Sequence, residues 1–247
     1  MPGETSVLFR RLAACRPARV GGLVSWGLAK IFCARVYGAR MSSISIIGAG
    51  TMAGILGTRA LAGGNTVEVI GRDAAKAADL ASDLGGGATA AATGAAPAGD
   101  IVILAVPYAS VAPVVSHYGD ALAGKVIVDI SNPFNPSATG LDTPDGTSIA
   151  QEIAKAAPAS AHVVKAFNTI FGHVLAQGRP LDVFIAGDDA QAKASMSAFI
   201  ETLGLRPLDT SDLTMAHWLE GAGLLMMGLG RYGVGNYSFS LGVNIPG

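Results

Sequence analysis

The chain has 247 residues, a length sufficient for one large α/β domain with a sizeable core. Of these residues, 50% are hydrophobic and 14% are charged. No stretch of about 18 apolar residues runs free of charged residues and glycines, so we expect no membrane-spanning helix. Residues 41–247 hold 10 of the 17 basic side chains but 17 of the 18 acidic ones, which argues against nucleic-acid binding by this part.

Residues 1–40 are the basic part of the chain and hold both of its cysteines. An arginine-rich, acid-poor start is typical of an organelle transit peptide, whereas the run 21–36 is too short and too interrupted for a signal-peptide core. Alternatively, Met41 is the true start, because a predicted strand follows it at once, and the preceding residues are an upstream extension or a cloning remnant. A functional arm is the third interpretation. We leave this leader or extension outside the predicted fold.

The rest of the chain has no cysteine, which fits a reducing compartment, and we expect the protein in the cytoplasm. From Met41 onward, short β-branched runs alternate with longer alanine-rich segments. The expected strands cover residues 45–48, 66–70, 100–106, 125–130, 162–167 and 182–186, with a weaker one near 206–208. The expected helices cover residues 52–61, 74–84, 110–118, 148–156 and 190–203.

The alternation of strand and helix predicts an α/β fold, a Rossmann-type, doubly wound and mainly parallel sheet over residues 41–210. Residues 211–247 are expected to form a small, mostly helical C-terminal part that closes the fold. Within it, residues 213–233 are rich in leucine, methionine and small residues at helical spacing. Such a stretch is typical of a buried helix or a subunit interface, with the lining of a planar apolar ligand as the alternative. We expect a homodimer through this region.

The first expected strand leads into the stretch GAGTMA, which begins at Gly48 and fits the pattern G-x-G-x-x-A. In this pattern, the first glycine permits a tight turn, the second lets a pyrophosphate approach the backbone, and the small third residue lets the helix pack on the sheet. Amides and the dipole at the helix start attract the phosphates. Glycine needed for packing alone is the competing explanation. We predict that this turn binds a dinucleotide.

The second expected strand ends at Gly71-Arg72-Asp73, where the adenosine ribose of a bound dinucleotide lies in such folds. A guanidinium at Arg72 can hold a 2′-phosphate, and Lys76 adds positive charge one turn later. A solvated surface arginine is the alternative for Arg72, and Asp73 leaves NAD possible as the cofactor. We favour NADP.

The third expected strand ends at Val106 and Pro107, which we expect to form the wall beside the nicotinamide. Residues 131–146 contain three prolines and form a long rigid loop at a strand end, whereas the alanine-rich run 85–99 is interpreted as a surface connection. The four histidines show no metal-ligand spacing, so no metal site is expected. His173 is the best of them for contact with an acceptor, and no residue is singled out as a certain catalytic group.

Six motifs follow one another along the chain: GAGTMAG from Gly48, GRDAAKA from Gly71, LAVPY from Leu104, VVKAFNTI from Val163, AGDD from Ala186 and GLRPLDTSDL from Gly204. Their order resembles that of the NADPH-dependent reductases of the deazaflavin coenzyme F420, and the likeness runs from Ser43 to the carboxyl end. The KAFNTI stretch is also similar to the cytosolic domain of STEAP-type metalloreductases, which pass hydride from NADPH to an ordinary flavin.

The resemblance implies hydride transfer between NADPH and the deazaflavin ring, stacked face to face in a cleft. The residues that it places at NADP are Gly48, Gly50, Thr51, Met52, Arg72 and Lys76, with Val106 and Pro107 lining the nicotinamide. The residues that it places around the acceptor are Ser131, Asn132, Pro133, Asn168 and Thr169. The family often has a serine and two cations at the ribose phosphate, whereas this chain has Gly71, Arg72 and Asp73.

Together these observations predict an NADP-dependent oxidoreductase that acts on a small-molecule co-substrate, coenzyme F420. A flavin, a quinone or an imine is the alternative acceptor, and a regulatory protein that binds NADP without turnover is the alternative of another class. Because both reacting carbons belong to cofactors, the protein has to align two rings and exclude water, and no catalytic triad is required.

Overall fold

The computed structural model describes residues 41–92 and 94–246, and these residues belong to one compact unit. The predictions for residues 1–40 lie outside the described residues, and the boundary after residue 210 stays a prediction. No helix in the described ranges has both the length and the apolar character needed to cross a membrane.

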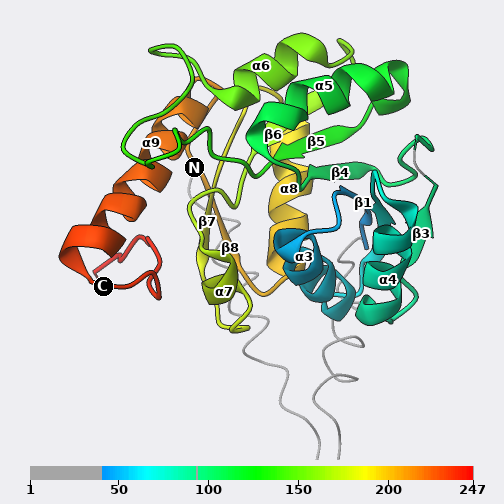
Figure 1. Ribbon diagram of the computed structural model, residues 1–247, viewed down its shortest axis with the longest axis horizontal. Coiled ribbons are helices and arrows are strands. Elements are labelled where there is room, and N and C mark those ends of the chain that lie inside the picture. Colours follow the sequence, from blue (N-terminus) through cyan, green and yellow to red (C-terminus); the bar gives the residue numbers. More distant parts are fainter. Residues whose placement is uncertain (1–40, 93, 247) are drawn as a thin grey trace, which may run out of the picture. The chain divides into compact units, whose positions relative to one another are not determined.

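Eight strands form a single sheet in the order β3-β2-β1-β4-β5-β6-β7-β8 (Figure 1). The strands are β1 (Ser43–Ile47), β2 (Thr66–Ile70), β3 (Thr89–Ala91), β4 (Ile101–Leu104), β5 (Val126–Asp129), β6 (His162–Lys165), β7 (Asp182–Gly187) and β8 (Arg206–Asp209). Neighbours are parallel except β6 and β7, which pair antiparallel. The predicted Rossmann-type, mainly parallel sheet is therefore confirmed.

Helices cover both faces of the sheet. The helical elements are α3 (Thr51–Ala62), α4 (Ala74–Leu84), α5 (Tyr108–Tyr118), η1 (Gly119–Leu122), α6 (Ile149–Ala156), α7 (Gly172–Leu175), α8 (Ala190–Thr202), α9 (Met215–Gly228) and η2 (Leu229–Gly233). One apolar core contains residues of α3, α4, α7 and α8, and the other contains residues of α5, α6 and α9. Alternate residues of β4 enter the two cores, which explains why this strand is apolar at every position.

The C-terminal helix α9 lies at the opposite end of the sheet from β3 and α4 (Figure 1). Ala216 and Leu219 are buried, whereas Trp218, Leu225 and Leu229 are exposed. This helix therefore has one face packed on the domain and an apolar face open to solvent, and its helical state agrees with the expected helical C-terminal part.

Two expected elements need correction. Residues 85–99 were expected to be a surface connection, but Thr89–Ala91 form a short edge strand that pairs with β2. Alanine can occupy a strand, but the segment lacks the run of β-branched residues that would have predicted one. Helix α5 begins at Tyr108 rather than residue 110, because Pro107 occupies its N-cap position. The helix at 74–84 begins after Asp73 as predicted, since the Asp73 carboxylate caps it.

The carboxyl ends of β1, β2, β4, β5 and β6 all meet at one edge of the sheet, because these strands are parallel. In doubly wound folds, ligands bind at this edge. The motifs at residues 48–53, 71–76, 105–108, 131–148 and 166–173 all follow these strand ends. We call this region the ligand edge.

Candidate functional site

The turn after β1 uses its two glycines for different purposes. Gly48 has a φ of +124°, and a side chain there would overlap the carbonyl of Ala105 at the end of β4. Gly50 has an extended backbone that any residue adopts, and a side chain at this position would meet nothing within 4 Å. Packing therefore explains Gly48 but not Gly50, and the open space at Gly50 is what an approaching phosphate requires.

The start of α3 is prepared for an anion. Gly50 occupies its N-cap position without a side-chain hydrogen bond to the helix, and the first turn holds no acidic residue. The amides of this turn and the positive end of the helix dipole are therefore directed at the ligand edge. Ala53, the small third residue of the pattern, lies in the first turn of α3 and is fully buried, which agrees with its predicted packing role.

At the end of β2, the two charged neighbours are used differently. The Asp73 carboxylate accepts hydrogen bonds from the backbone amides of Ala75 and Lys76 at 3.1 and 3.2 Å and thereby caps α4. Arg72 and Lys76 are exposed. One Asp73 oxygen is therefore engaged by the helix, and the contacts of Arg72 and Asp73 with a ribose stay predictions.

The end of β4 is joined to the loop that follows β5. Val106 is half-buried and Pro107 is exposed, as a surface beside a cofactor would be. The Tyr108 hydroxyl donates a 2.7 Å hydrogen bond to Asp142 in residues 130–148, which we call the β5–α6 loop. This hydrogen bond raises the pKa of Tyr108, because the neighbouring carboxylate disfavours the phenolate.

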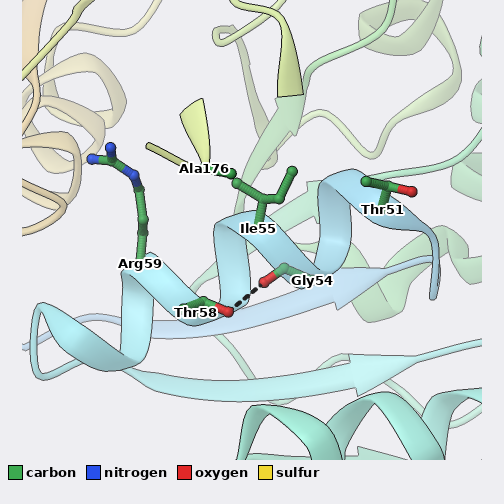
Figure 2. Close-up of a pocket in the computed structure, with 6 residues that line it drawn as sticks. All are labelled: Thr51, Gly54, Ile55, Thr58, Arg59 and Ala176. Atoms are coloured by element: carbon green, nitrogen blue, oxygen red, sulfur yellow. Dashed lines mark hydrogen bonds between the residues drawn. The ribbon is translucent and has the colours of Figure 1, made fainter. Parts of the chain in front are cut away.

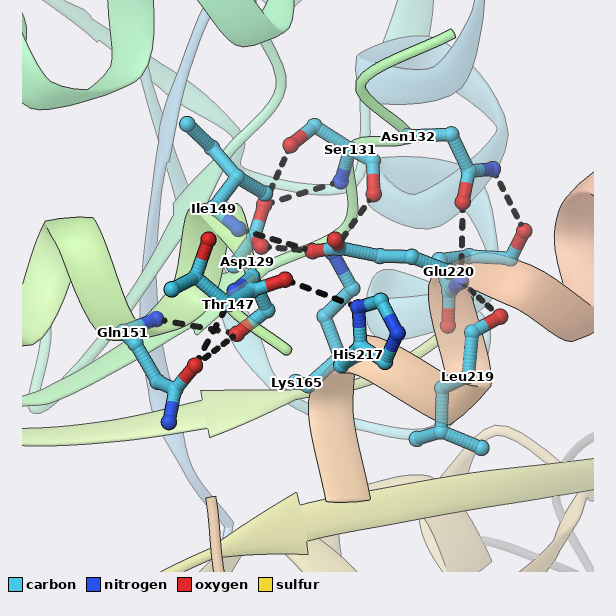
Figure 3. Close-up of polar contacts among 12 residues, drawn as sticks. Asp129, Ser131, Asn132, Thr147, Ile149, Gln151, Lys165, His217, Leu219 and Glu220 are labelled. Carbon is cyan, nitrogen blue, oxygen red and sulfur yellow. Dashed lines mark hydrogen bonds and ion pairs between the residues drawn. The ribbon is translucent and has the colours of Figure 1, made fainter. Parts of the chain in front are cut away.

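Three buried charges lie at the ends of β5 and β6 (Figure 3). The Lys165 ammonium donates to Asp129 at 2.7 Å, to Glu220 of α9 at 2.8 Å and to the Ser131 carbonyl at 2.7 Å. All three charged side chains are fully buried. We call Asp129, Lys165 and Glu220 the charged cluster; sequence reasoning missed it.

Glu220 links α9 to two other elements. Its Oε1 accepts from the Lys165 ammonium and from the backbone amide of Ile149 at the start of α6, whereas its Oε2 has no hydrogen-bond partner among the described residues. Burial raises the pKa of Glu220 despite the contact with Lys165, and the nearby Asp129 raises it further.

The predicted acceptor residues come together, but mostly below the surface. Asp129 accepts from both the backbone amide and the hydroxyl of Ser131, at 2.9 and 2.7 Å. Asn132 and Asn168 exchange hydrogen bonds of 2.8 and 2.9 Å, and Asn168 also donates to the Leu219 carbonyl. In this set only Asn132 is half-buried; the buried members are Ser131, Pro133, Asn168 and Thr169. Their contact with an acceptor stays a prediction.

An aromatic group lies between α7 and the C-terminal tail. Phe171 packs edge-to-face on Tyr237 and Phe239, with ring centroids 5.4 Å apart in both pairs, and its ring stacks on His173 at 6.0 Å. The neighbouring Gly172 lies close to Met52 in the first turn of α3. The tail thus lies near the predicted cofactor turn. His173, exposed and beside Ser238, is available there.

A shallow hollow of about 270 Å³ runs along α3 from Thr51 at the helix start to Arg59 (Figure 2). Its lining residues are Thr51, Gly54, Ile55, Thr58, Arg59 and Ala176. The Arg59 guanidinium donates to the carbonyls of Leu175, Leu203 and Arg179, and therefore closes the ends of α7 and α8. Within the described residues, no group of three or more histidine, cysteine or acidic side chains is placed to hold a metal ion.

The chain is similar in sequence to several known oxidoreductases. Residues 43–133 match the family model described as NADP oxidoreductase, coenzyme F420-dependent. The chain is 29% identical over 144 residues to the F420-dependent NADP reductase of Methanocaldococcus jannaschii, covering 55% of this chain and 64% of that protein. It is 31% identical over 191 residues to metalloreductase STEAP3 of Rattus norvegicus, covering 74% of this chain and 37% of that protein.

Among solved structures, the fold is similar to that of a putative F420-dependent NADP reductase from Arthrobacter sp. FB24. The TM-score is 0.72 at 25% identity, with 82% of this chain and 99% of the other covered. The chain spans only about two thirds and about one third of the two curated relatives that it matches. These findings support the predicted family and the distant STEAP relation. They also support an NADP-dependent oxidoreductase, without identifying its hydride acceptor.

Proposed function

We propose that this protein transfers hydride between NADPH and a deazaflavin, because residues 43–133 match the family model of the coenzyme F420-dependent NADP oxidoreductases. The observation that carries the proposal is the turn after β1. There, Gly50 leaves open space before an uncapped helix start, beside exposed cations at the end of β2. Such a turn is suited to a pyrophosphate and the end of β2 to a 2′-phosphate.

When bound, NADPH supplies the hydride, and the residues of this chain supply binding, orientation and exclusion of water. We assign the phosphates to the amides of Gly50, Thr51 and Met52, and the 2′-phosphate to Arg72 with Lys76. Val106 and Pro107 form the surface against which the nicotinamide is held. Holding two rings in reacting alignment is worth about 7–11 kcal/mol of the barrier, so no side-chain acid or base is required for the transfer itself.

The acceptor is expected next to the nicotinamide, over the start of the β5–α6 loop. Asn132 is the half-buried member of the predicted acceptor set and is held by Asn168, whereas Ser131, Pro133, Asn168 and Thr169 are buried. A deazaflavin is the acceptor that the family suggests. A flavin, a quinone or an imine is the alternative on the same cofactor site, and binding of NADP without turnover is the alternative of another class.

Stopped-flow mixing distinguishes these possibilities. The enzyme is preloaded with NADPH and mixed in separate runs with coenzyme F420, FMN, a benzoquinone and a cyclic imine, while the NADPH absorbance is followed. We expect rapid oxidation with F420 and slow or no oxidation with the others. Oxidation by another acceptor alone would replace the deazaflavin in the proposal, and NADPH binding without any oxidation would favour the regulatory alternative.

The remaining expectations concern the assembly and its place in the cell. We propose a homodimer that packs through the exposed apolar face of α9 and the start of η2, where Trp218, Leu225 and Leu229 lie. Light scattering behind size-exclusion chromatography tests this directly, with Leu225→Glu as the variant expected to give monomers. A cytoplasmic location is proposed as well, and fractionation of the host cells tests it.

A further inference from the structure

Two residues at the start of the β5–α6 loop are held from several sides. The Ser131 amide donates to Asp129, and the Ser131 carbonyl accepts from Lys165 (Figure 3). Both charged groups are fully buried, and the ammonium is also held by Glu220 from α9. The peptide groups on both sides of Ser131 are therefore fixed by charges that solvent does not reach.

The next residue, Asn132, is fixed by a second set of contacts. The Asn132 side-chain nitrogen donates to the backbone carbonyl of Asn168 at 2.8 Å, and the Asn132 side-chain oxygen accepts from the Asn168 side-chain nitrogen at 2.9 Å. The same Asn168 nitrogen donates to the Leu219 carbonyl of α9 at 2.8 Å. Because Asn168 is 6% exposed, this pair forms the floor of the loop and not a flexible surface contact.

Helix α9 reaches this floor only because residue 223 is a glycine. A Cβ at Gly223 would lie 2.8 Å from the Asn132 amide oxygen and 3.2 Å from the amide carbon and nitrogen. Gly223 is buried in the middle of α9, where glycine weakens a helix relative to alanine. A residue that helix propensity disfavours thus lies where α9 passes close to the side-chain amide of Asn132.

We infer that α9 positions the acceptor side of the site, and that Gly223 is the positioning residue whose missing side chain lets α9 hold the Asn132–Asn168 pair. This inference rests on the proposed function for its meaning in the reaction. Leu219, Glu220 and Gly223 lie within about one helical turn, and they contact Asn168, Lys165 and Asn132 in turn. The helix is a fixed wall of the site.

The test compares two alanine substitutions in the same helix of the full chain. Gly223→Ala introduces the clash, whereas Gly221→Ala is the matched control, because a Cβ at Gly221 meets nothing within 4 Å. Amide hydrogen exchange of residues 131–135 is read by mass spectrometry without any ligand. We expect Gly223→Ala to increase the exchange rate of these amides by about ten-fold or more, which corresponds to the loss of one net hydrogen bond. We expect Gly221→Ala to leave the rate unchanged.

The same pair is then measured in an Asn132→Ala background. If the amide is the group that Gly223 accommodates, Gly223→Ala has no further effect there. Exchange in the loop that stays at the wild-type rate in Gly223→Ala, or that rises equally with and without Asn132, overturns the inference, because the effect would then come from the helix in general.

A kinetic readout separates this inference from the proposed function. NADPH affinity by fluorescence titration is expected to match the wild type in both variants, while the KM for coenzyme F420 rises about ten-fold in Gly223→Ala only. An equal loss of NADPH affinity would contradict a role confined to the acceptor side. If none of the acceptors tested leads to oxidation of NADPH by the wild type, the proposed function fails. The exchange experiment, which needs no ligand, still decides the positioning role of Gly223.

Discussion

At the carboxyl end of β1 the site consists of backbone, whereas at the carboxyl ends of β5 and β6 it is supported by buried charge. The first region needs only a turn with Gly48 and Gly50 and a helix start that follows within three residues. The second joins Asp129, Lys165 and Glu220, which come from two strands and a C-terminal helix. A phosphate site can be built from consecutive residues, but the acceptor site that we propose here depends on distant parts of the chain.

The largest effect is expected from breaking the charged region. Lys165→Met leaves Asp129 and Glu220 buried together without their cation, which we expect to lower the free energy of unfolding by about 3–5 kcal/mol. Urea unfolding followed by circular dichroism measures this loss. Lys155→Met, at an exposed pair with Glu152, is the control and should change little. A small effect at Lys165 would mean that the cluster does not stabilise the fold.

The backbone region separates into a packing glycine and a binding glycine. Gly48→Ala forces a side chain onto Ala105 at a positive φ, and we expect a loss of about 2–4 kcal/mol in unfolding free energy. Gly50→Ala should leave stability within about 0.5 kcal/mol but weaken NADPH, because only the ligand space is filled. Urea unfolding and fluorescence titration of both variants check this. Equal destabilisation by both substitutions would refute the division of roles.

The cationic flank of the backbone region tests the choice of cofactor. Arg72→Ala is expected to weaken NADPH by about 1.5–3 kcal/mol, the value of hydrogen bonds to a charged group, while NADH changes little. Titration calorimetry with both coenzymes measures the difference, and Lys155→Ala provides a control for lost surface charge. Parallel losses for NADPH and NADH would show that Arg72 does not contact the 2′-phosphate.

The smallest effect concerns the pH dependence of the charged region. Burial raises the pKa of Glu220, so the folded protein retains a proton that the unfolded chain has already released. This contribution to stability is complete below the ordinary glutamate pKa and is lost as pH rises through the raised pKa. The groups that face Glu220 are Lys165 and Asp129.

Glu220→Gln should therefore lessen the decline of stability with increasing pH. Urea unfolding at intervals between about pH 5 and about pH 8 measures the slopes of the variant and the wild type. Glu152→Gln, at an exposed position on α6, should keep the wild-type slope. Matching slopes in the wild type and Glu220→Gln would show that Glu220 titrates alike in the folded and unfolded chain.

The same contrast explains what the sequence could predict. The strand at 66–70, the helix at 74–84 and the turn at Gly48 follow from local periodicity, an aspartate cap and glycine spacing, and all three were predicted. Lys165 follows two valines in a strand, and its partners Asp129 and Glu220 lie 36 and 55 residues away. Because lysine and glutamate are rarely fully buried, nothing local indicated that they meet inside the protein.

Trp218 offers a consequence for spectroscopy. The chain has two tryptophans, and Trp26 precedes the described residues, so Trp218 is the sole indole of residues 41–247. It lies on α9 next to His217, with 66% of its surface exposed. In a Trp26→Phe protein, all tryptophan emission would therefore come from α9. Energy transfer from this indole to reduced nicotinamide would then report the distance between the helix and the coenzyme.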